Sequence, residues 1–346
     1  MPTPIERIAY AASQTARVGW YFGQYALAAR MSPIYTVPTD GRSPGVSLTT
    51  GEMMADIRRL FERDWANIER GLYKPPHDMA PKPLKMLDEA LRFFGDLPKV
   101  SERRLSGAGR EVRRSGRATA DMPDYYLQNF HFQSDGWLSD DSARRYDHQV
   151  EVLFSGAADA MRRQALVPLA RHLRRHGQNA RLLDVATGTG RFLTFARDSF
   201  PQLRVTGVDL SPHYLAEARR RLRPFGPARL LRGRAEALPQ PDGSQDLVTC
   251  IYLFHELPAE VRAQAVAEFA RVLVPGGRAI LVDSLQLGDR PQYDGLLERF
   301  PQGFHEPYYA DYIGTDLIAL FEAAGLHHCR TTHAFLSKVV TFDKPR

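Results

Sequence analysis

Cysteine is scarce in this chain of 346 residues, and long apolar runs are absent. The two cysteines, Cys250 and Cys329, form no C-x-x-C pair, which argues against a disulfide framework or a zinc site and fits a reducing cytoplasm. No window approaches about eighteen uninterrupted apolar residues, so we expect no transmembrane helix. Residues 1–6 lack the charged-then-apolar layout of a signal peptide. The sequence therefore predicts a cytoplasmic protein, and its 43% hydrophobic residues are ample for a core.

Charge is nearly balanced overall, at +6, but it is unevenly distributed. Residues 99–117 carry seven Lys and Arg against only two acidic residues, Glu102 and Glu111. Such a run predicts either a solvated linker or a surface that attracts anionic lipid, nucleic acid or an acidic substrate. The same stretch has none of the aromatic residues that stack on RNA bases.

The first third of the chain is predicted to be mainly helical, with helices near residues 5–30, 50–70 and 83–94 and a Pro- and Gly-rich loop at 31–50. The first helix combines arginines with a broad Trp, Tyr and Phe face. Two interpretations stay open for it: a helix docked on the core, or a helix lying in a membrane interface.

Residues 125–139 are aromatic and polar and precede a helix expected at about 143–175. This density of aromatic residues outside a periodic pattern indicates either a pocket wall or a packed cap over the core. As a pocket wall, it offers Tyr126 and His131 as candidate catalytic residues and Phe130 and Trp137 as acceptor contacts.

The chain is organised around residues 182–192, Leu-Leu-Asp-Val-Ala-Thr-Gly-Thr-Gly-Arg-Phe. An apolar run ends in Asp184, passes two glycines and re-enters a helix-compatible pattern, as expected for a buried parallel strand, a tight turn and a helix. Gly188 and Gly190 allow the sharp bend and the close approach of a ligand. A second apolar strand ends in Asp209, where Rossmann-type folds hold ribose hydroxyls.

Strands and helices alternate from there onward, which predicts a doubly wound sheet. We expect strands near 181–185, 203–208, 228–232, 246–252 and 278–284, followed by an antiparallel pair near 327–333 and 335–343. We expect helices near 190–199, 212–222, 258–273 and 314–324, the second of them capped by Ser211 and Pro212.

Three segments together resemble class I S-adenosylmethionine (AdoMet) methyltransferases, most closely the ubiquinone/menaquinone-biosynthesis type. These segments are Asp184–Gly190, Val208–Ser211 and Arg271–Gly277. The NAD fingerprint would need a third glycine where Leu193 stands. One departure is Ala186, where many members of the family carry the first glycine.

The resemblance implies an AdoMet site and S-adenosylhomocysteine as the product. Asp184 would order the glycine turn, Asp209 would accept two ribose hydroxyls and Leu210 would lie against adenine. At the adenine edge many members carry an acid where Arg234 stands, so Glu236 or the backbone of Ala235 would take its place. The complete set of implied cofactor residues is Asp184, Ala186, Thr187, Gly188, Gly190, Asp209, Leu210, Ala235, Glu236 and Tyr252.

The end of the fourth expected strand carries His255, whose side chain suits proton transfer near neutral pH or the fixing of a loop. Glu256 is interpreted as a charge at a helix N-terminus. Residues 304–312 form an insertion that often shapes the acceptor pocket in this family, and they add His305, Tyr308, Tyr309 and Tyr312 as acceptor contacts. Asp283 ends the fifth strand and points toward the same site. No cluster of metal ligands is visible, and no Asn/Asp-Pro-Pro-Tyr/Phe motif indicates a DNA substrate.

These features predict an α/β fold: a doubly wound, Rossmann-like, seven-stranded methyltransferase sheet with an N-terminal, mainly helical extension. We expect the extension with its basic linker at 1–120, an aromatic cap and lead-in helix at 121–178, and the AdoMet-binding domain at 179–346. The predicted function is direct, in-line methyl transfer to a small apolar, aromatic or lipid-like acceptor, with peripheral membrane contact. An AdoMet-binding regulatory or scaffold protein and an RNA methyltransferase remain the alternatives.

Overall fold

The computed structural model describes residues 2–32 and 48–346, so most of the loop predicted at 31–50 lies outside it. Its centre is a seven-stranded sheet with the order β3-β2-β1-β4-β5-β7-β6. The strands are β1 (Arg181–Val185), β2 (Arg204–Asp209), β3 (Arg229–Arg232), β4 (Gln245–Ile251), β5 (Leu273–Ser284), β6 (His327–Ala334) and β7 (Ser337–Asp343). Strands β1 to β5 pair in parallel, whereas β7 pairs antiparallel with both β5 and β6. The predicted fold class is confirmed.

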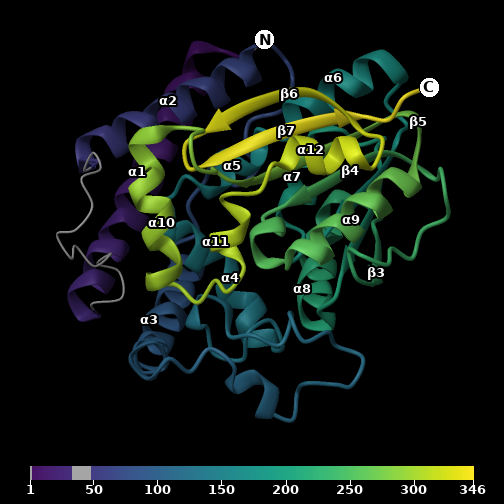
Figure 1. The fold of residues 1–346 in the computed structure, drawn as a ribbon. Coiled ribbons are helices and arrows are strands. Elements are labelled where there is room, and N and C mark those ends of the chain that lie inside the picture. Colours follow the sequence, from purple (N-terminus) through teal and green to yellow (C-terminus); the bar gives the residue numbers. More distant parts are fainter. Residues whose placement is uncertain (1, 33–47) are drawn as a thin grey trace.

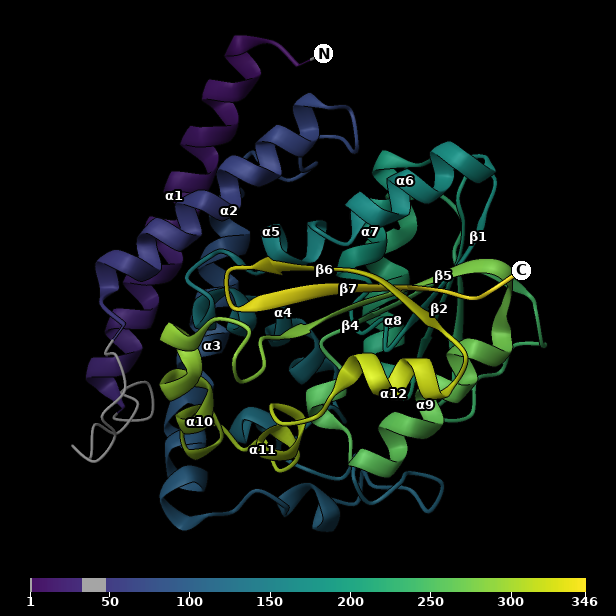
Figure 2. The same cartoon turned by 45° about the horizontal axis from the view of Figure 1, so that its top comes forward.

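Two apolar cores lie on opposite faces of this sheet, because successive side chains of a strand point to opposite sides. Leu182 and Leu247 belong to the core on one face, whereas their neighbours Leu183 and Val248 belong to the core on the other. Figure 2 shows α6 (Leu166–His176) and α7 (Arg191–Ser199) on one side of the sheet, and α9 (Ala259–Val272) and α12 (Leu317–Ala323) on the other. The remaining helix of the alternating unit is α8 (Pro212–Leu222).

The N-terminal helices lie along one side of the sheet domain (Figure 1). They are α1 (Pro4–Met31), α2 (Thr50–Glu69) and α3 (Pro83–Ser106). Helix α1 buries Tyr10, Tyr21 and Ala28, so of the two interpretations of the first helix the docked one describes its packing. The 3.1–3.2 Å contacts of Arg163 on α5 (Ala158–Arg163) to both carboxylate oxygens of Asp64 join α2 to the lead-in helices.

The lead-in region differs from its prediction, because the helix expected at 143–175 is three helices. They are α4 (Asp140–Leu153), α5 and α6. Ser155 (φ 50°) and Gly156 (φ 83°) adopt left-handed backbone angles that separate α4 from α5. The Arg17 side chain reaches this break and donates to the Gly156 carbonyl at 3.2 Å. The break therefore serves as a docking point for α1.

The basic linker expected around 99–117 is also ordered structure. Helix α3 continues past Pro98 to Ser106, and a 3-10 turn, η2, covers Glu111–Arg114. Arg103 donates to the hydroxyl of Ser134 at 2.9 Å, and Arg113 donates to the Leu127 carbonyl at 3.2 Å. These two arginines therefore hold the aromatic segment in place. The count of charges in the sequence could not distinguish such internal contacts from arginines exposed to solvent.

Candidate active site

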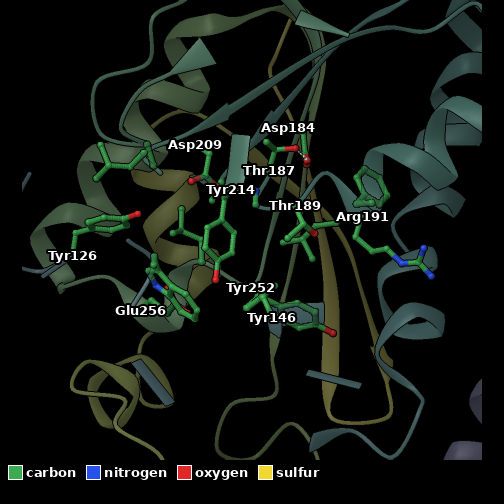
Figure 3. Close-up of a pocket in the computed structure, with 18 of the residues that line it drawn as sticks. Tyr126, Tyr146, Asp184, Thr187, Thr189, Arg191, Asp209, Tyr214, Tyr252 and Glu256 are labelled. Carbon is green, nitrogen blue, oxygen red and sulfur yellow. Dashed lines mark hydrogen bonds between the residues drawn. The ribbon is translucent and has the colours of Figure 1, made fainter. Parts of the chain in front are cut away.

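A cavity of about 1030 Å³, its open mouth included, lies at the carboxyl ends of β1, β2 and β4 (Figure 3). We call it the cofactor cavity. Ligands gather at this edge of a doubly wound sheet because the connecting loops leave a crevice there. Eight of the predicted cofactor residues line it: Asp184, Ala186, Thr187, Gly188, Asp209, Leu210, Ala235 and Tyr252.

The turn after β1 is held by the buried carboxylate of Asp184. Its two oxygens accept from the hydroxyl of Thr187 at 2.7 Å and from that of Thr249 at 2.6 Å. Burial raises the pKa of Asp184 to about 6, although both hydroxyls oppose the shift. Ala186 adopts φ 55°, a left-handed angle that costs a residue with a Cβ about 1 kcal/mol. This explains why glycine suits that position in related turns.

Asp209 closes the same turn from β2. Its carboxylate accepts from the backbone N–H groups of Gly188 and Ser211, each at 2.8 Å. Burial raises the pKa of Asp209 to about 6, and the backbone hydrogen bonds lower it. Each carboxylate oxygen has a second lone pair for a ribose hydroxyl. In Figure 3 the phenol of Tyr126 points toward Asp209, and its buried hydroxyl has no hydrogen-bond partner among the described residues.

Two predicted cofactor residues lie outside the cavity lining. Gly190 faces α8, where a Cβ would come within 3.1 Å of the Ala218 Cβ, so this glycine serves helix packing. Glu236 instead accepts from the hydroxyl of Tyr125, which lies 2.8 and 2.9 Å from its two carboxylate oxygens. Arg234 and the neighbouring Ala235 line the cofactor cavity instead.

The aromatic segment, residues 125–139, forms one wall of the cofactor cavity. Trp137 stacks on Phe130 with ring centroids 5.7 Å apart and meets Tyr146 and Tyr214 edge-on. The hydroxyl of Ser211 donates to the Trp137 carbonyl at 2.6 Å, which fixes the segment to the turn after β2. Phe130 and Trp137, predicted as acceptor contacts, line the cofactor cavity.

A second, more apolar cavity of about 1340 Å³ lies next to the first, and we call it the acceptor cavity. Its walls include side chains of α1, α2, α4 and α10 (Asp294–Gly303). They include Phe22, Tyr25, Met53, Met54, Val150, Leu153, Leu296, Leu297, Phe300 and Phe304. Tyr146, Tyr252 and Glu256 line both cavities. The two cavities therefore meet at these three side chains.

His255 lies in the wall of the acceptor cavity and pairs with Asp283 at the end of β5. Its Nδ1 is 2.6 Å from Oδ1 of Asp283, whose other oxygen accepts the Phe254 N–H at 2.8 Å. Burial lowers the pKa of His255, but the charge and hydrogen bond of Asp283 outweigh burial and raise it to about 10. The fixed ring can meet an acceptor oxygen with its opposite edge.

The sequence suggested that Glu256 is a charge at a helix N-terminus. In the structure it lies instead in a 3-10 turn, η5 (Phe254–Glu256), three residues before α9. Burial raises the pKa of Glu256 well above its usual range, and Glu306 raises it further. His131, predicted as catalytic, lines the acceptor cavity next to Glu256 and Glu306. The sequence showed no metal-ligand cluster, yet the fold brings these three side chains together.

The insertion at 304–312 contributes less to the acceptor cavity than predicted. Tyr309 lines it, and its hydroxyl is 2.6 Å from that of Ser284. His305, Tyr308 and Tyr312 line neither cavity. His305 instead pairs with Gln128 at 3.0 Å, and the hydroxyl of Tyr312 donates to the Ser284 carbonyl at 2.7 Å.

Tyr146 and the acceptor-cavity residues of α1, α2 and α10 were not among the candidates chosen from the sequence. Tyr146 lies inside a regular helical pattern, where an aromatic residue signals only burial. Met53 and Met54 likewise fit the apolar stripe of an ordinary amphipathic helix. Only the placement of α1 and α2 against the sheet shows that these stripes enclose a cavity.

Comparison with known proteins agrees with this site. Residues 182–277 match the family model described as "Methyltransferase domain". Demethylmenaquinone methyltransferase of Deinococcus radiodurans is 38% identical over 142 residues, 41% of this chain and 56% of the relative. The ubiquinone/menaquinone biosynthesis C-methyltransferase UbiE of Methylobacterium nodulans is 37% identical over 161 residues, 46% of this chain and 62% of the relative. UbiE of Desulfotalea psychrophila is 30% identical over 206 residues, 60% of this chain and 78% of the relative.

The sheet order, the glycine turn and the acid after β2 define a class I AdoMet-dependent methyltransferase fold. This chain belongs to the ubiquinone/menaquinone-biosynthesis (UbiE) family of that class. It spans about 60% of the length of the first two relatives named above. AdoMet is the cofactor that the family uses, and Asp209 together with the unpartnered hydroxyl of Tyr126 offers this cavity the polar groups that a nucleoside requires.

Proposed function

We propose that this protein transfers the methyl group of AdoMet to a carbon atom of a reduced, quinone-like aromatic acceptor. The observation that carries the proposal is the contact between the two cavities at Tyr146, Tyr252 and Glu256. In-line transfer needs the donor carbon and the acceptor carbon in contact and shielded from water. A cofactor in one cavity and an acceptor in the other would meet across these side chains.

The acceptor is inferred from the chemistry of its cavity and from the names of the relatives. The walls are mostly Phe, Leu, Met and Tyr side chains, which suit an aromatic ring with an apolar tail. His255 and Ser284 are among the polar groups of that wall and suit ring oxygens. The names of the relatives describe methylation of demethylmenaquinone or steps in ubiquinone and menaquinone biosynthesis.

AdoMet, when bound, supplies an electrophilic methyl group, so the chain has to orient the acceptor and exclude water. In the proposed mechanism, His255 contacts a ring oxygen next to the reacting carbon, and Asp283 holds the imidazole in that orientation. Hydrogen bonding to this oxygen stabilises the negative charge that makes the ring carbon nucleophilic. Tyr146 and Tyr252 close the space around the transferred methyl.

The N-terminal helices are part of this proposal rather than a separate unit. Phe22 and Tyr25 of α1 and Met53 and Met54 of α2 line the acceptor cavity. We propose that residues 1–120 serve as the acceptor-binding cover of the AdoMet domain at 179–346, joined by the aromatic cap and lead-in helices at 121–178. Removal of the cover should abolish acceptor binding before it affects cofactor binding.

We also propose that the apolar acceptor is taken from a membrane surface through contact with α3. Leu84, Leu87 and Leu91 are 52–86% exposed and recur at i, i+3 and i+7, with Lys82 exposed just before that helix and Lys99 exposed on it. This combination suits the interface of an anionic bilayer. No helix among the described residues is long and apolar enough to span a membrane. Co-sedimentation with anionic vesicles at low salt tests this; Leu87→Asp should release the protein, and equal pelleting of both would contradict it.

The test of methyl transfer uses the purified full chain, AdoMet carrying a deuterated methyl group, and a chemically reduced demethylnaphthoquinone with a short isoprenoid tail. The expected result is S-adenosylhomocysteine in equal amount to a product that carries the deuterated methyl on a ring carbon. Tight AdoMet binding without product from this or a benzoquinol acceptor would favour the regulatory or scaffold alternative. An RNA acceptor is disfavoured because Arg103 and Arg113 are already bound to Ser134 and Leu127.

A further inference from the structure

Three side chains far apart in the sequence converge at the wall of the acceptor cavity. One ligand-type atom from each of His131, Glu256 and Glu306 lies within 4.8 Å of the other two. A backbone hydrogen bond of 3.4 Å from His131 to the His305 carbonyl joins the two segments that carry His131 and Glu306. Glu256 comes from the turn after β4, so three separate connections meet here.

The carboxylate of Glu306 is buried, and its one ion-pair contact among the described residues is with the imidazole of His131. The Glu306 side chain has no exposed surface, and neither oxygen has a hydrogen-bond partner among the described residues. Nε2 of His131 lies 3.0 Å from Oε1, but the pair lacks hydrogen-bond geometry. In the part of the chain that the structure describes, no Lys or Arg forms an ion pair with Glu306 or Glu256. Two carboxylates placed together in this way are stabilised either by a positive partner or by taking up a proton.

The spacing suits a metal ion better than a direct contact. Two ligands of a tetrahedral site with bonds of about 2.0–2.1 Å are about 3.3 Å apart. The 3.0 Å separation of His131 and Glu306 is close to this value, and the 4.8 Å limit of the cluster requires only a small movement of the remaining side chains. One imidazole and two carboxylates form a donor set for zinc or a similar first-row divalent cation rather than for magnesium or calcium, which prefer oxygen alone.

We propose that His131, Glu256 and Glu306 bind one divalent cation, zinc in the first instance, in the wall of the acceptor cavity. Three protein ligands leave an open position, as catalytic zinc sites do. His131 and Glu256 both line the acceptor cavity, so the open position faces it. That an oxygen of the acceptor fills this position rests on the proposed function; cation binding itself does not.

The test measures metal directly. The full chain is treated with a chelator, loaded with Zn²⁺ or Co²⁺, desalted and analysed for metal content, with the visible absorption of Co²⁺ as a signature of protein ligands. About one ion per chain is expected, and His131→Asn and Glu306→Gln should each weaken binding by at least about 100-fold, more than loss of an outer hydrogen bond does. Glu89→Gln is the matched control, because Glu89 also lies next to a histidine but outside the proposed site. Its carboxylate is 3.8 Å from Nδ1 of His148, and Nε2 of the same ring is 2.8 Å from Gln24.

Calorimetric AdoMet affinity, unchanged in each variant, confirms that the variants are folded. Absence of a stoichiometric ion in the wild type would overturn the proposal, as would equal metal content in wild type and Glu306→Gln. In that case the carboxyl pair shares a proton instead, and Glu306→Gln should raise the melting temperature. Metal binding without methyl transfer would support the site and count against the proposed function alone.

Discussion

Nδ1 of His255 lies 2.6 Å from Oδ1 of Asp283, and this pair joins the turn after β4 to the end of β5 beside the acceptor cavity. Asp283 is fully buried, so the contact is shielded from solvent. The pair fixes the imidazole in the wall of the acceptor cavity, where the proposed mechanism needs a contact to an acceptor oxygen. His255 and Asp283 are far apart in the sequence, so the orientation of the imidazole is defined only when the fold brings them together.

Replacing His255 with Asn should lower kcat by about 100-fold, since loss of one oriented donor at a developing charge typically costs that much. AdoMet affinity should change less than about twofold, because His255 lines only the acceptor cavity. Steady-state kinetics with calorimetry measure both quantities. His213→Asn, on the exposed start of α8, serves as the control and should leave both unchanged. A comparable loss of AdoMet binding in His255→Asn would place this residue at the cofactor instead.

AdoMet affinity should depend on pH through Asp209 and Asp184. The pKa of each is raised to about 6 by burial, and only the ionised form of Asp209 offers all its lone pairs to ribose. Affinity should therefore be constant above pH 7 and fall as the pH drops through 6, by up to about tenfold per unit for each proton taken up. Calorimetry between pH 5 and 8 checks this.

The matching variant is Asp209→Asn, which keeps the shape of the side chain and removes its charge. It should bind AdoMet about 30-fold more weakly at pH 7.5, because about 2 kcal/mol is lost with charged hydrogen bonds, and its acid dependence should be shallower. A dissociation constant that stays flat from pH 5 to 8 in the wild type would refute the ribose assignment.

Filling the acceptor cavity should block turnover without affecting the cofactor. Met53→Trp adds a large ring to a cavity wall on α2, so we expect the KM for the quinol to rise at least about tenfold. AdoMet affinity should stay within about twofold. Met31→Trp, on an exposed position of α1, is the size-matched control. Normal kinetics in Met53→Trp would show that the acceptor binds elsewhere.

The packing of the N-terminal helices against the lead-in helices should depend on the buried carboxylate of Asp64. Asp64 is fully buried and accepts from the hydroxyls of Tyr10 and Tyr73 as well as from Arg163. Asp64→Ala leaves a buried guanidinium unpaired, so it should lower the free energy of unfolding by about 3–5 kcal/mol. Urea denaturation measures this, with Asp242→Ala as the control. The Asp242 side chain is 82% exposed in its ion pair with Arg271, so its loss should cost about 0–1 kcal/mol. Equal effects would contradict a structural role for Asp64.

Much of the fold could be predicted because local patterns set it. The apolar runs that end at Asp184 and Asp209 identified β1 and β2, and the Ser211-Pro212 pair marked the start of α8. The break of the lead-in helix could not be predicted, because Ser155 takes a left-handed angle where Arg17 docks from a distant helix.

The residues of the candidate site likewise fall into those that local motifs could predict and those that depend on the packing of distant segments. Asp184 and Asp209 could be assigned because each lies in a contiguous motif whose turn places it. Most walls of the acceptor cavity could not, since Met53 on α2, Tyr146 on α4 and Phe300 on α10 approach it from separate segments. Trp137 was predicted as an acceptor contact but lines the cofactor cavity, because an aromatic residue carries no local signal for the side on which it packs.

A crystal structure of the protein with S-adenosylhomocysteine and a quinone analogue tests the account most directly. We expect the sulfur at the junction of Tyr146, Tyr252 and Glu256, with the analogue ring in the acceptor cavity next to His255 and a ring carbon facing the sulfur. A sulfur directed away from this junction, or an analogue bound outside the acceptor cavity, would contradict methyl transfer between the two cavities.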